Sequence, residues 1–534
     1  MLTLTRRCLA LIQIINKTAK IFGPPGTGKT TRLIKIIEKW LRLGVQPHEI
    51  VYVSFTNKAV NEAVSRVIKK FTSYKEEDFD NFRTIHSFCK KHLDNVQVVD
   101  PRIDMLEFHT DWGTVSANMS DEDMNNRIFN NWFLRVYDKS RNLLIEPDEA
   151  FRRETIKRGR LIQYRDIIRN YEEFKKNHKI DFTDMVEKYI KEVNAQHYKV
   201  FIVDEAQDLT PLQWKFVYKI AEKAKRIYLA GDDDQAIYEW NGADVHCFLG
   251  FPGKVFTLKK SYRLNKDIHS LSKEILKFIT VRQEKEFTSN NVRGYIERYS
   301  KFNEIPIEKI KGSWLILGRV RKNVNELRDF ARAKGLYFQD MRGNKSFNMN
   351  KWLAISYWEK LKNNGTITKE EAGIMYDFIH EVRRGWRKID AKSWSAIHPN
   401  EPLKLDFLKQ KAGLETTHTD WWKVLNRKFT IKDLDYFETM LKNNVELDDK
   451  ANIIIDTIHS VKGGEADNVI IYEKSNWPSH FNSKNGNDKM AEARVWYTGV
   501  TRAKKTLHLL ATNHEFYFPM GKIFSNYKRS IDDE

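Results

Sequence analysis

The segment AKIFGPPGTGKTTRLIKII, from Ala19 to Ile37, constrains the fold more than any other part of the chain. Its centre has the spacing G-x-x-x-x-G-K-T, with an apolar strand pattern before it and an apolar helical pattern after it. That context is typical of a P-loop, in which backbone N–H groups at a helix N-terminus surround phosphate oxygens. The segment therefore predicts a parallel α/β sheet with a phosphate site at its carboxyl edge.

Two residues of this loop have predicted chemical roles. Lys29 is expected to reach the β- and γ-phosphates of a nucleotide, and Thr30 is expected to hold Mg²⁺. The residues expected to surround the nucleotide are Gly23, Pro24, Pro25, Gly26, Thr27, Gly28, Lys29, Thr30 and Thr31. The alternative is a glycine-rich turn with a chance Gly-Lys-Thr, which the flanking strand and helix patterns disfavour.

A second apolar strand pattern ends in two acids. In KVFIVDEAQDL, the short buried run Val200–Val203 is followed by Asp204 and Glu205. Asp204 is placed to bind Mg²⁺, directly or through water, and Glu205 is placed to polarise an attacking water. Acidic pairs also occur at ordinary solvated strand ends, but this pair follows a P-loop and precedes Gln207.

The composition limits the class of protein. With 534 residues the chain exceeds one typical core, so three or four structural units are expected. It has 91 Lys and Arg against 72 Asp and Glu, a net charge of +19. This balance favours a polyanionic partner, with a generally basic proteome as the alternative. No run approaches the ~18 apolar residues of a membrane helix, so no membrane partner is expected.

Cysteine usage argues against several kinds of metal centre. The three cysteines, Cys8, Cys89 and Cys247, form no CxxC pair. This pattern disfavours a zinc ribbon, an iron–sulfur cluster and a disulfide scaffold, and it fits a reducing cytoplasm.

Further blocks follow the P-loop in a fixed order. They are FTNKAVNEAVSR (Phe55–Arg66), TIHSF (Thr84–Phe88), DFTDM (Asp181–Met185), VDEAQD (Val203–Asp208), GDDDQAIYEWNGAD (Gly231–Asp244), LKKSYRLN (Leu258–Asn265), DTIHSVKGGEADNVII (Asp456–Ile471) and EARVWYTGVTRAKKTLHL (Glu492–Leu509). Together with the P-loop, this series resembles the motifs of superfamily 1A DNA helicases of the UvrD/Rep type. The resemblance covers nearly the whole chain, with two less matched insertions between the blocks.

The resemblance implies an α/β fold with two RecA-like, parallel-sheet motor domains, each interrupted by a mainly helical insertion. It implies ATP and Mg²⁺ as cofactors, bound between the two domains. By position, Gln235 would contact the γ-phosphate, and Arg263 and Arg502 would neutralise charge on the transferring phosphoryl group. The remaining implied roles are adenine stacking by Tyr262, a ribose contact by Glu465, and coupling of hydrolysis to the domain interface by Gln207.

The resemblance also implies a track for single-stranded DNA, with tailed duplex DNA as the substrate and a 3′→5′ direction. The residues implied along the track are Phe55, Thr56, Asn57, His86, Phe88, Tyr238, Trp240, His459 and Ser460. Aromatic rings stack on any base, so binding would tolerate any sequence. Phe55 and Phe88 have a plain alternative as core residues. Gln235 is the implied phosphate contact, and Tyr238 and Trp240 form the implied aromatic step on which bases would stack. If the stretch between Gln235 and Tyr238 is helical, about one turn separates the two.

Several positions depart from the family pattern. Asn241 stands where the family usually has arginine, and Ser261 stands where asparagine is usual. Gly464 and Ala466 replace a large apolar and an aromatic residue, so that loop is expected to be more flexible. The adenine-reading glutamine expected before the P-loop falls near Cys8.

The motifs divide the chain into domains. Residues 1–92 and 178–250 are predicted to form the first motor domain, residues 93–177 its helical insertion, residues 251–350 and 451–534 the second motor domain, and residues 351–450 a compact second insertion. The second insertion holds Trp352, Trp358, Trp386, Trp394, Trp421 and Trp422. These tryptophans are expected to fill its own core, with a grip on duplex DNA or a protein partner as the alternative.

The sequence therefore predicts an ATP-dependent DNA helicase or translocase that works as a monomer in the cytoplasm of a bacterium or a bacterial host cell. Three alternatives stay open: a superfamily 1B helicase running 5′→3′, an RNA helicase, and a DNA-stimulated ATPase subunit of a larger nuclease or defence complex. Repair, replication and recombination are all compatible with the motifs.

Overall fold

The computed structural model describes residues 14–94, 96–98, 107–111, 113–116, 131–154, 159–388, 392–399, 401–445, 447, 451–475 and 486–532. The chain divides into two compact units. Unit 1 contains residues 1–294, 481–501 and 523–534, and unit 2 contains residues 295–480 and 502–522. In the described part of the chain, no helix is long and apolar enough to cross a membrane.

Unit 1 is built on a six-stranded sheet with the order β3-β2-β6-β7-β1-β8, in which every neighbouring pair is parallel. Its strands are β1 (Thr18–Phe22), β2 (Ile50–Ser54), β3 (Phe82–Thr84), β6 (Val200–Val203), β7 (Arg226–Gly231) and β8 (Lys254–Thr257). The central strands are apolar runs buried on both faces, as parallel strands covered by helices usually are.

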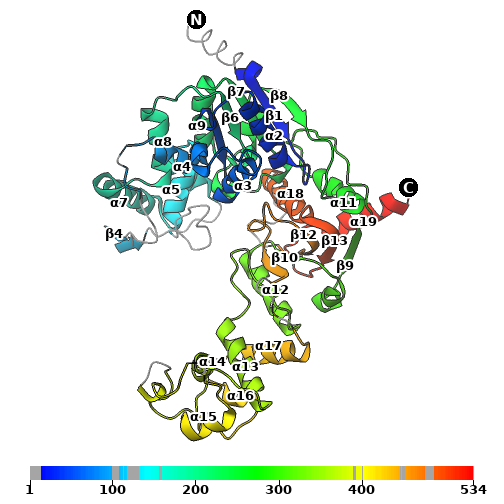
Figure 1. Cartoon of the computed structure of the whole chain (residues 1–534). Coiled ribbons are helices and arrows are strands. Elements are labelled where there is room, and N and C mark those ends of the chain that lie inside the picture. Colours follow the sequence, from blue (N-terminus) through cyan, green and yellow to red (C-terminus); the bar gives the residue numbers. More distant parts are fainter. Residues whose placement is uncertain are drawn as a thin grey trace, which may run out of the picture. The chain divides into compact units, whose positions relative to one another are not determined.

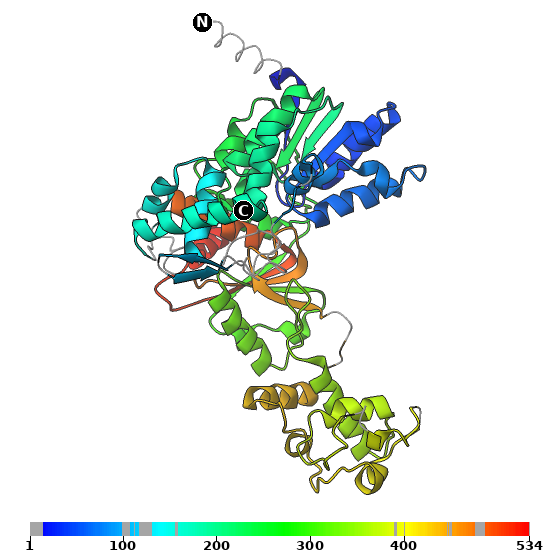
Figure 2. The same ribbon diagram turned by 90° about the vertical axis from the view of Figure 1, so that its left-hand side faces the viewer.

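Helices cover both faces of this sheet (Figures 1 and 2). Leu33 and Ile37 of α2 pack with Val64 of α3 in one core, and Phe216 and Val217 of α9 belong to the other. The helices of unit 1 are α2 (Lys29–Arg42), α3 (Asn57–Ile68), α4 (Ile85–Lys91), α5 (Trp132–Leu143), α6 (Pro147–Arg153), α7 (Leu161–His178), α8 (Phe182–Glu192), α9 (Pro211–Lys223), α10 (Val245–Gly250), α11 (Lys266–Leu276), α18 (Gly486–Val500) and most of α19 (Met520–Asp532).

The carboxyl ends of three strands meet at one edge. The last residues of β1 and β7 are in register, and the Gly23 N–H donates to the Gly231 carbonyl over 3.0 Å. The Asp204 N–H donates to the Val53 carbonyl over 2.9 Å, which sets the acidic block beside β2. The three segments that follow β1, β6 and β7 therefore leave the sheet next to one another.

A buried ionic network joins the first insertion to the DFTDM block. The insertion contains a hairpin of β4 (Glu107–Thr110) and β5 (Gly113–Ser116) and the helices α5 to α7. Arg141 of α5 is paired with Asp181 over 3.0 Å and with Glu187 over 2.9 Å, and Lys175 of α7 is paired with Asp181 over 2.9 Å. The Asp181 side chain also caps α8, so one carboxylate holds three helices.

Unit 2 contains a second parallel sheet with the order β11-β10-β12-β13-β9. Its strands are β9 (Tyr295–Tyr299), β10 (Trp314–Gly318), β11 (Ile453–Thr457), β12 (Ala466–Tyr472) and β13 (Ala503–Leu510). Helix α12 (Arg321–Ala333) packs against β10 and β11. The predicted fold class, two parallel-sheet α/β domains with helical insertions, is confirmed.

The second insertion has a hydrophobic core of its own. Its helices are α13 (Met349–Lys362), α14 (Lys369–Tyr376), α15 (Leu405–Lys411), α16 (Trp421–Val424) and α17 (Ile431–Lys442). Trp358, Trp394 and Trp421 are buried in this core, and Trp352 and Trp386 pack against it. Trp422 is 45% exposed. The expectation that tryptophans fill this core is confirmed for five of the six.

One predicted boundary needs correction. The motifs predicted that the second motor domain begins at residue 251, but β8 pairs with β1 and extends the first sheet. Residues as far as Gly294 belong to unit 1, and so does α18 from the last motif. β8 belongs to the first sheet because it is hydrogen-bonded to β1, which is distant in the sequence, and no local sequence pattern predicts such a pairing. The other domain boundaries stay predictions.

Candidate functional site

The P-loop links β1 to α2 through backbone conformations that favour glycine. Gly26 and Gly28 have φ of 70° and 81°, in the left-handed region. A Cβ on Gly26 would lie 2.3 Å from the Arg263 Cβ, so the loop also depends on glycine for close packing. Helix α2 begins at Lys29 directly after Gly28, which directs its first N–H groups into the loop. This geometry fits a phosphate group.

The side chains of the loop agree with that assignment. The Lys29 ammonium donates to the Gly23 carbonyl over 3.0 Å, so it already lies across the mouth of the loop. The Thr27 hydroxyl donates to the Pro24 carbonyl over 2.7 Å and braces the turn. Thr30 and Thr31 lie in the first turn of α2, one half-buried and the other exposed.

The acidic block follows β6 immediately. Asp204 is 2% exposed, accepts a hydrogen bond of 2.8 Å from the Tyr52 hydroxyl, and accepts another of 2.9 Å from the Glu205 N–H. Burial and the neighbouring Glu205 raise the pKa of Asp204 to about 6, while Tyr52 and Lys29 act in the opposite sense. Hydroxyl and carboxylate oxygens are ligands that Mg²⁺ accepts, so Thr30 and Asp204 fit the predicted metal.

Glu205 has a φ of 53°, which is uncommon for a residue with a side chain. Strained backbone at the end of a strand often accompanies a functional residue. Here the turn carries the chain from β6 into the short 3-10 helix Ala206–Asp208, and Glu205 stays half-buried. The role of Glu205 in polarising water stays a prediction.

Gln207 connects the acidic block to the segment after β7. Its side-chain amide donates to a Glu205 carboxylate oxygen over 2.6 Å and to Asp208 over 3.0 Å. Its carbonyl oxygen accepts from the Asp232 N–H over 3.0 Å. The side chain is fully buried, and a Cβ on Gly231 would lie 2.5 Å from it. The predicted coupling residue therefore bridges two motifs physically.

Gln235 lies at the end of a short 3-10 helix, Asp233–Gln235. It is 5% exposed, and its amide donates to the Asp232 carboxylate over 2.6 Å. The chain from Ala236 to Tyr238 is not helical, and Ala236 has a ψ of 93°. The estimate of one helical turn between Gln235 and Tyr238 therefore does not apply, because the 3-10 helix ends at Gln235 and Ala236 is extended.

Aromatic side chains gather just beyond this turn. The rings of Phe55 and Tyr238 stack at 5.0 Å, and Trp240 lies 6.4 Å from Tyr238 and is 45% exposed. Asn57 is exposed at the start of α3, and the hydroxyl of Thr56 caps that helix. An exposed ring beside a stacked pair can accept a flat ligand such as a base.

Two other residues of the predicted track come from α4. His86 is half-buried and meets Phe182 edge-on at 5.8 Å. Phe88 is fully buried and packs edge-on against Tyr189 and Phe216. The prediction that Phe88 contacts DNA is therefore wrong, because no part of its ring reaches solvent. It is a core residue, the alternative that the sequence left open.

The block after β8 lies against the P-loop. The Tyr262 N–H donates to the Gly26 carbonyl over 2.9 Å, and the Ser261 hydroxyl donates to the Pro25 carbonyl over 2.7 Å. The Tyr262 ring is 71% exposed, as a ring that stacks on adenine needs to be. Arg263 is half-buried and donates to the Thr501 carbonyl over 3.3 Å.

The remaining predicted residues belong to unit 2. Arg502 is 3% exposed and donates to the Gly464 carbonyl over 3.1 Å. Glu465 is exposed and paired with Lys504 over 2.6 Å. Ser460 is exposed, His459 is half-buried, and the Ser460 hydroxyl shares a 2.8 Å hydrogen bond with Thr457. Their predicted roles stay predictions.

Comparison with known proteins identifies the family. The model of the UvrD/REP helicase N-terminal domain matches residues 4–256, and that of the UvrD-like helicase C-terminal domain matches residues 422–514. Together these matches cover more than half of the chain. The chain belongs to the UvrD/Rep helicase family.

Curated relatives agree with this assignment over most of the chain. A probable DNA helicase II homolog of Mycoplasma pneumoniae is 24% identical over 96% of this chain and 84% of its own length. The ATP-dependent DNA helicase PcrA of Staphylococcus aureus is 23% identical over the same shares of the two chains. The resemblance to UvrD/Rep helicases inferred from the motifs is confirmed.

Some departures from the UvrD/Rep pattern now have a physical account. Ser261 bridges two segments, because its hydroxyl donates to Pro25 and accepts from the Leu264 N–H over 3.0 Å. Asn241 ends the short 3-10 helix Glu239–Asn241 and is half-buried. The segment around Cys8 and Gln13 lies outside the described residues.

The sequence missed the partners of the three aspartates after β7. Asp233 and Asp234 are both fully buried. Lys285 is ion-paired with Asp233 and, over 2.9 Å, with Asp234, and Arg282 is paired with Asp234 over 2.6 Å. The run of three acids was the available signal, because buried acids need cationic partners.

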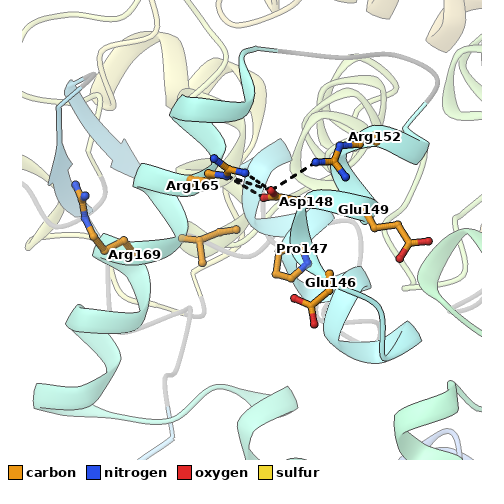
Figure 3. Close-up of a pocket in the computed structure, with 8 residues that line it drawn as sticks. Glu146, Pro147, Asp148, Glu149, Arg152, Arg165 and Arg169 are labelled. Carbon is orange, nitrogen blue, oxygen red and sulfur yellow. Dashed lines mark hydrogen bonds and ion pairs between the residues drawn. The ribbon is translucent and has the colours of Figure 1, made fainter.

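The first insertion of this helicase carries a surface groove of about 660 Å³, lined mostly by charged residues (Figure 3). Asp148 at its centre is paired with Arg165 and, over 3.8 Å, with Arg152. Its lining residues are Glu146, Pro147, Asp148, Glu149, Arg152, Arg165, Ile168 and Arg169. Three arginines and three carboxylates line the groove, so the lining has no formal net charge that favours an anion.

Proposed function

We propose that the chain is an ATP-dependent DNA helicase that translocates on single-stranded DNA in the 3′→5′ direction and unwinds tailed duplexes. Family membership supports the helicase activity, and the names of the relatives support ATP and DNA as ligands. The direction and the single-stranded track rest on the motifs alone.

The observation that carries the proposal is the chain of hydrogen bonds from the acidic block to Gln235, three residues before Tyr238. Gln207 holds the Glu205 carboxylate and the Asp232 N–H, and the Asp232 carboxylate holds the Gln235 amide. The aromatic step follows only a few residues later. A change at the γ-phosphate can therefore reach the base-stacking rings through directly bonded groups.

Each residue of the ATP site has a role that its geometry permits. Lys29 and the loop N–H groups would hold the β- and γ-phosphates, and Glu205 would orient the attacking water. Thr30 and Asp204 would hold Mg²⁺, which supplies positive charge to the phosphate oxygens. Arg263 would add charge beside the loop, and Tyr262 would stack on adenine. Arg502 is proposed as a second arginine of the same reaction.

A strand-displacement assay tests the proposal. The expected result is ATP-dependent separation of a duplex with a 3′ single-stranded tail, and little separation of the same duplex with a 5′ tail. Preference for the 5′ tail would replace the proposed direction with the 5′→3′ alternative. Stimulation of the ATPase by RNA and not by DNA would favour the RNA helicase.

The second candidate is a DNA-stimulated ATPase subunit of a larger complex. The observation that favours a protein partner is the exposed Trp422 on the second insertion. The other tryptophans of this insertion are mostly buried in its core. ATP hydrolysis on DNA without strand separation of either tailed duplex would favour this candidate.

A further inference from the structure

We propose that Arg494 is a positioning residue that ties the γ-phosphate contact to the base-stacking aromatics. The inference rests on the proposed function and extends it, because it names the side chain that transmits the nucleotide state. Arg494 has no role among the residues predicted from the motifs, although it lies within the last of them.

The Arg494 guanidinium bonds three separate segments at once. It is 2% exposed on α18, and its Nε donates to the Asp233 carbonyl over 3.0 Å. Its Nη1 is paired with the Glu239 carboxylate over 2.7 Å. Its Nη2 donates to the Val281 carbonyl over 2.8 Å. The rigid planar fork of arginine allows this geometry, which a lysine ammonium cannot reproduce.

The two ends of this bridge enclose the predicted coupling segment. Asp233 begins the short 3-10 helix that ends at Gln235, and Glu239 lies between Tyr238 and Trp240. Between them, Ala236 and Ile237 are buried. Arg494 therefore bonds both ends of residues 233–239, the stretch that contains Gln235 and Tyr238.

The Asp233 end of the bridge is firmly held. Besides the ion pair of Asp233 with Lys285, the Gln283 N–H donates to the Asp233 carboxylate over 2.7 Å. The Glu239 end belongs to a half-buried short 3-10 helix that carries the exposed Trp240. A displacement that starts at Gln235 is therefore passed by Arg494 to the Glu239 end, where the base would stack.

Charge is what gives this link its strength. Hydrogen bonds between ionised partners are stronger than neutral ones, and the burial of Arg494 and partial burial of Glu239 reduce screening by water. Glu239→Gln keeps the size and one acceptor oxygen but removes the negative charge. It weakens the link at the aromatic end and leaves the Asp233 and Val281 contacts of Arg494 in place.

The test compares DNA stimulation in the full-length wild type, Glu239→Gln and Arg494→Lys. In Glu239→Gln the ratio of DNA-stimulated to DNA-free ATPase should fall about tenfold, the factor for weakening a hydrogen bond between charged groups. The KM for ATP should stay the same, because the P-loop is untouched. In Arg494→Lys the stimulation ratio should fall further, because the lysine loses two of the three contacts.

Glu473→Gln is the matched control. Glu473 is 1% exposed and paired with Arg298 over 2.7 Å, within unit 2. Both glutamine variants should lower the melting temperature, since each weakens a buried pair. Only Glu239→Gln should lower the stimulation ratio. An unchanged ratio in Glu239→Gln, or an equal fall in Glu473→Gln, would overturn the proposal.

A second measurement needs no DNA. Hydrogen exchange of residues 236–244 is followed by mass spectrometry with and without a non-hydrolysable ATP analogue. The analogue should change their protection in the wild type, and this change should be largely lost in Glu239→Gln. Equal responses in both proteins would overturn the inference. A wild type without DNA-stimulated ATPase would instead overturn the proposed function. The exchange measurement would still test whether Arg494 and Glu239 transmit the nucleotide state to residues 236–244.

Discussion

Lys29 has the clearest individual role, because its ammonium lies across the P-loop in contact with the Gly23 carbonyl. Lys29→Ala should abolish ATP hydrolysis and unwinding, a loss greater than about 10²-fold, since it removes a preorganised charge at the transferring phosphate. The side chain is half-buried, so the melting temperature should change little. Full DNA-stimulated ATPase in this variant would contradict the assigned site.

Trp240 offers a comparison between two equally exposed rings. Trp240 and Trp422 are each 45% exposed, one beside the predicted DNA track and the other on the second insertion. Trp240→Ala should weaken binding of single-stranded DNA by about 1–3 kcal/mol, the value of stacking one base on an aromatic ring. Its loss of coupling should exceed its loss of basal hydrolysis, whereas Trp422→Ala should leave both unchanged. Similar effects of the two variants would argue against a specific track.

At the scale of helices, the buried network of α5, α7 and α8 should make stability depend on pH. The Asp138 carboxylate accepts hydrogen bonds from the Thr183 hydroxyl and, over 3.2 Å, from the Asn142 amide. Burial first, and then the nearby Asp181, raise the pKa of Asp138 from 3.8 to about 6. Between pH 3.8 and about pH 6, Asp138 keeps a proton in the folded chain that it has lost in the unfolded chain. The free energy of unfolding therefore falls as the pH rises through this range.

Asp138→Asn should remove this part of the pH dependence. The effect is at most about 3 kcal/mol, from 1.36 kcal/mol for each unit of pKa. Urea unfolding at pH 4 and at pH 7 measures it, as the difference between the wild type and the variant at each pH. Parallel stability profiles for the two proteins would show that Asp138 titrates normally.

The second insertion should depend on its tryptophan core. Trp358 is 1% exposed, and its indole N–H donates to the Thr419 carbonyl over 2.9 Å. Trp358→Ala should destabilise the insertion by about 3–5 kcal/mol, the usual cost of removing a large buried ring. Trp422→Ala, at the exposed neighbouring ring, should cost much less. Denaturant unfolding followed by fluorescence distinguishes the two variants.

The elements that the sequence predicted well are those defined by short patterns. A buried apolar run followed by a polar turn predicted both β6 with Asp204 and β1 with the P-loop. Each prediction needed only residues that are adjacent in the sequence. Phe88, β8 and Lys285 depend on packing between segments distant in the sequence. Phe88 fits a stacking ring or a core ring equally well until its neighbours Tyr189 and Phe216 are known.

At the scale of the whole molecule, the net charge of +19 should appear in the salt dependence of DNA binding. Binding to single strands releases counterions, so the logarithm of the affinity should fall linearly with the logarithm of the salt concentration, by about 0.7 per phosphate neutralised. Fluorescence anisotropy with a labelled oligothymidine, over a series of sodium chloride concentrations, gives the slope.

Trp240→Ala separates the charge contribution from the stacking contribution in the same experiment. A neutral ring neutralises no phosphate, so the variant should lower the affinity equally at every salt concentration and keep the slope of the wild type. A changed slope would mean that the substitution displaces basic residues from the DNA. An affinity that does not respond to salt would contradict a role for the basic excess in binding, and would leave stacking as the main source of affinity.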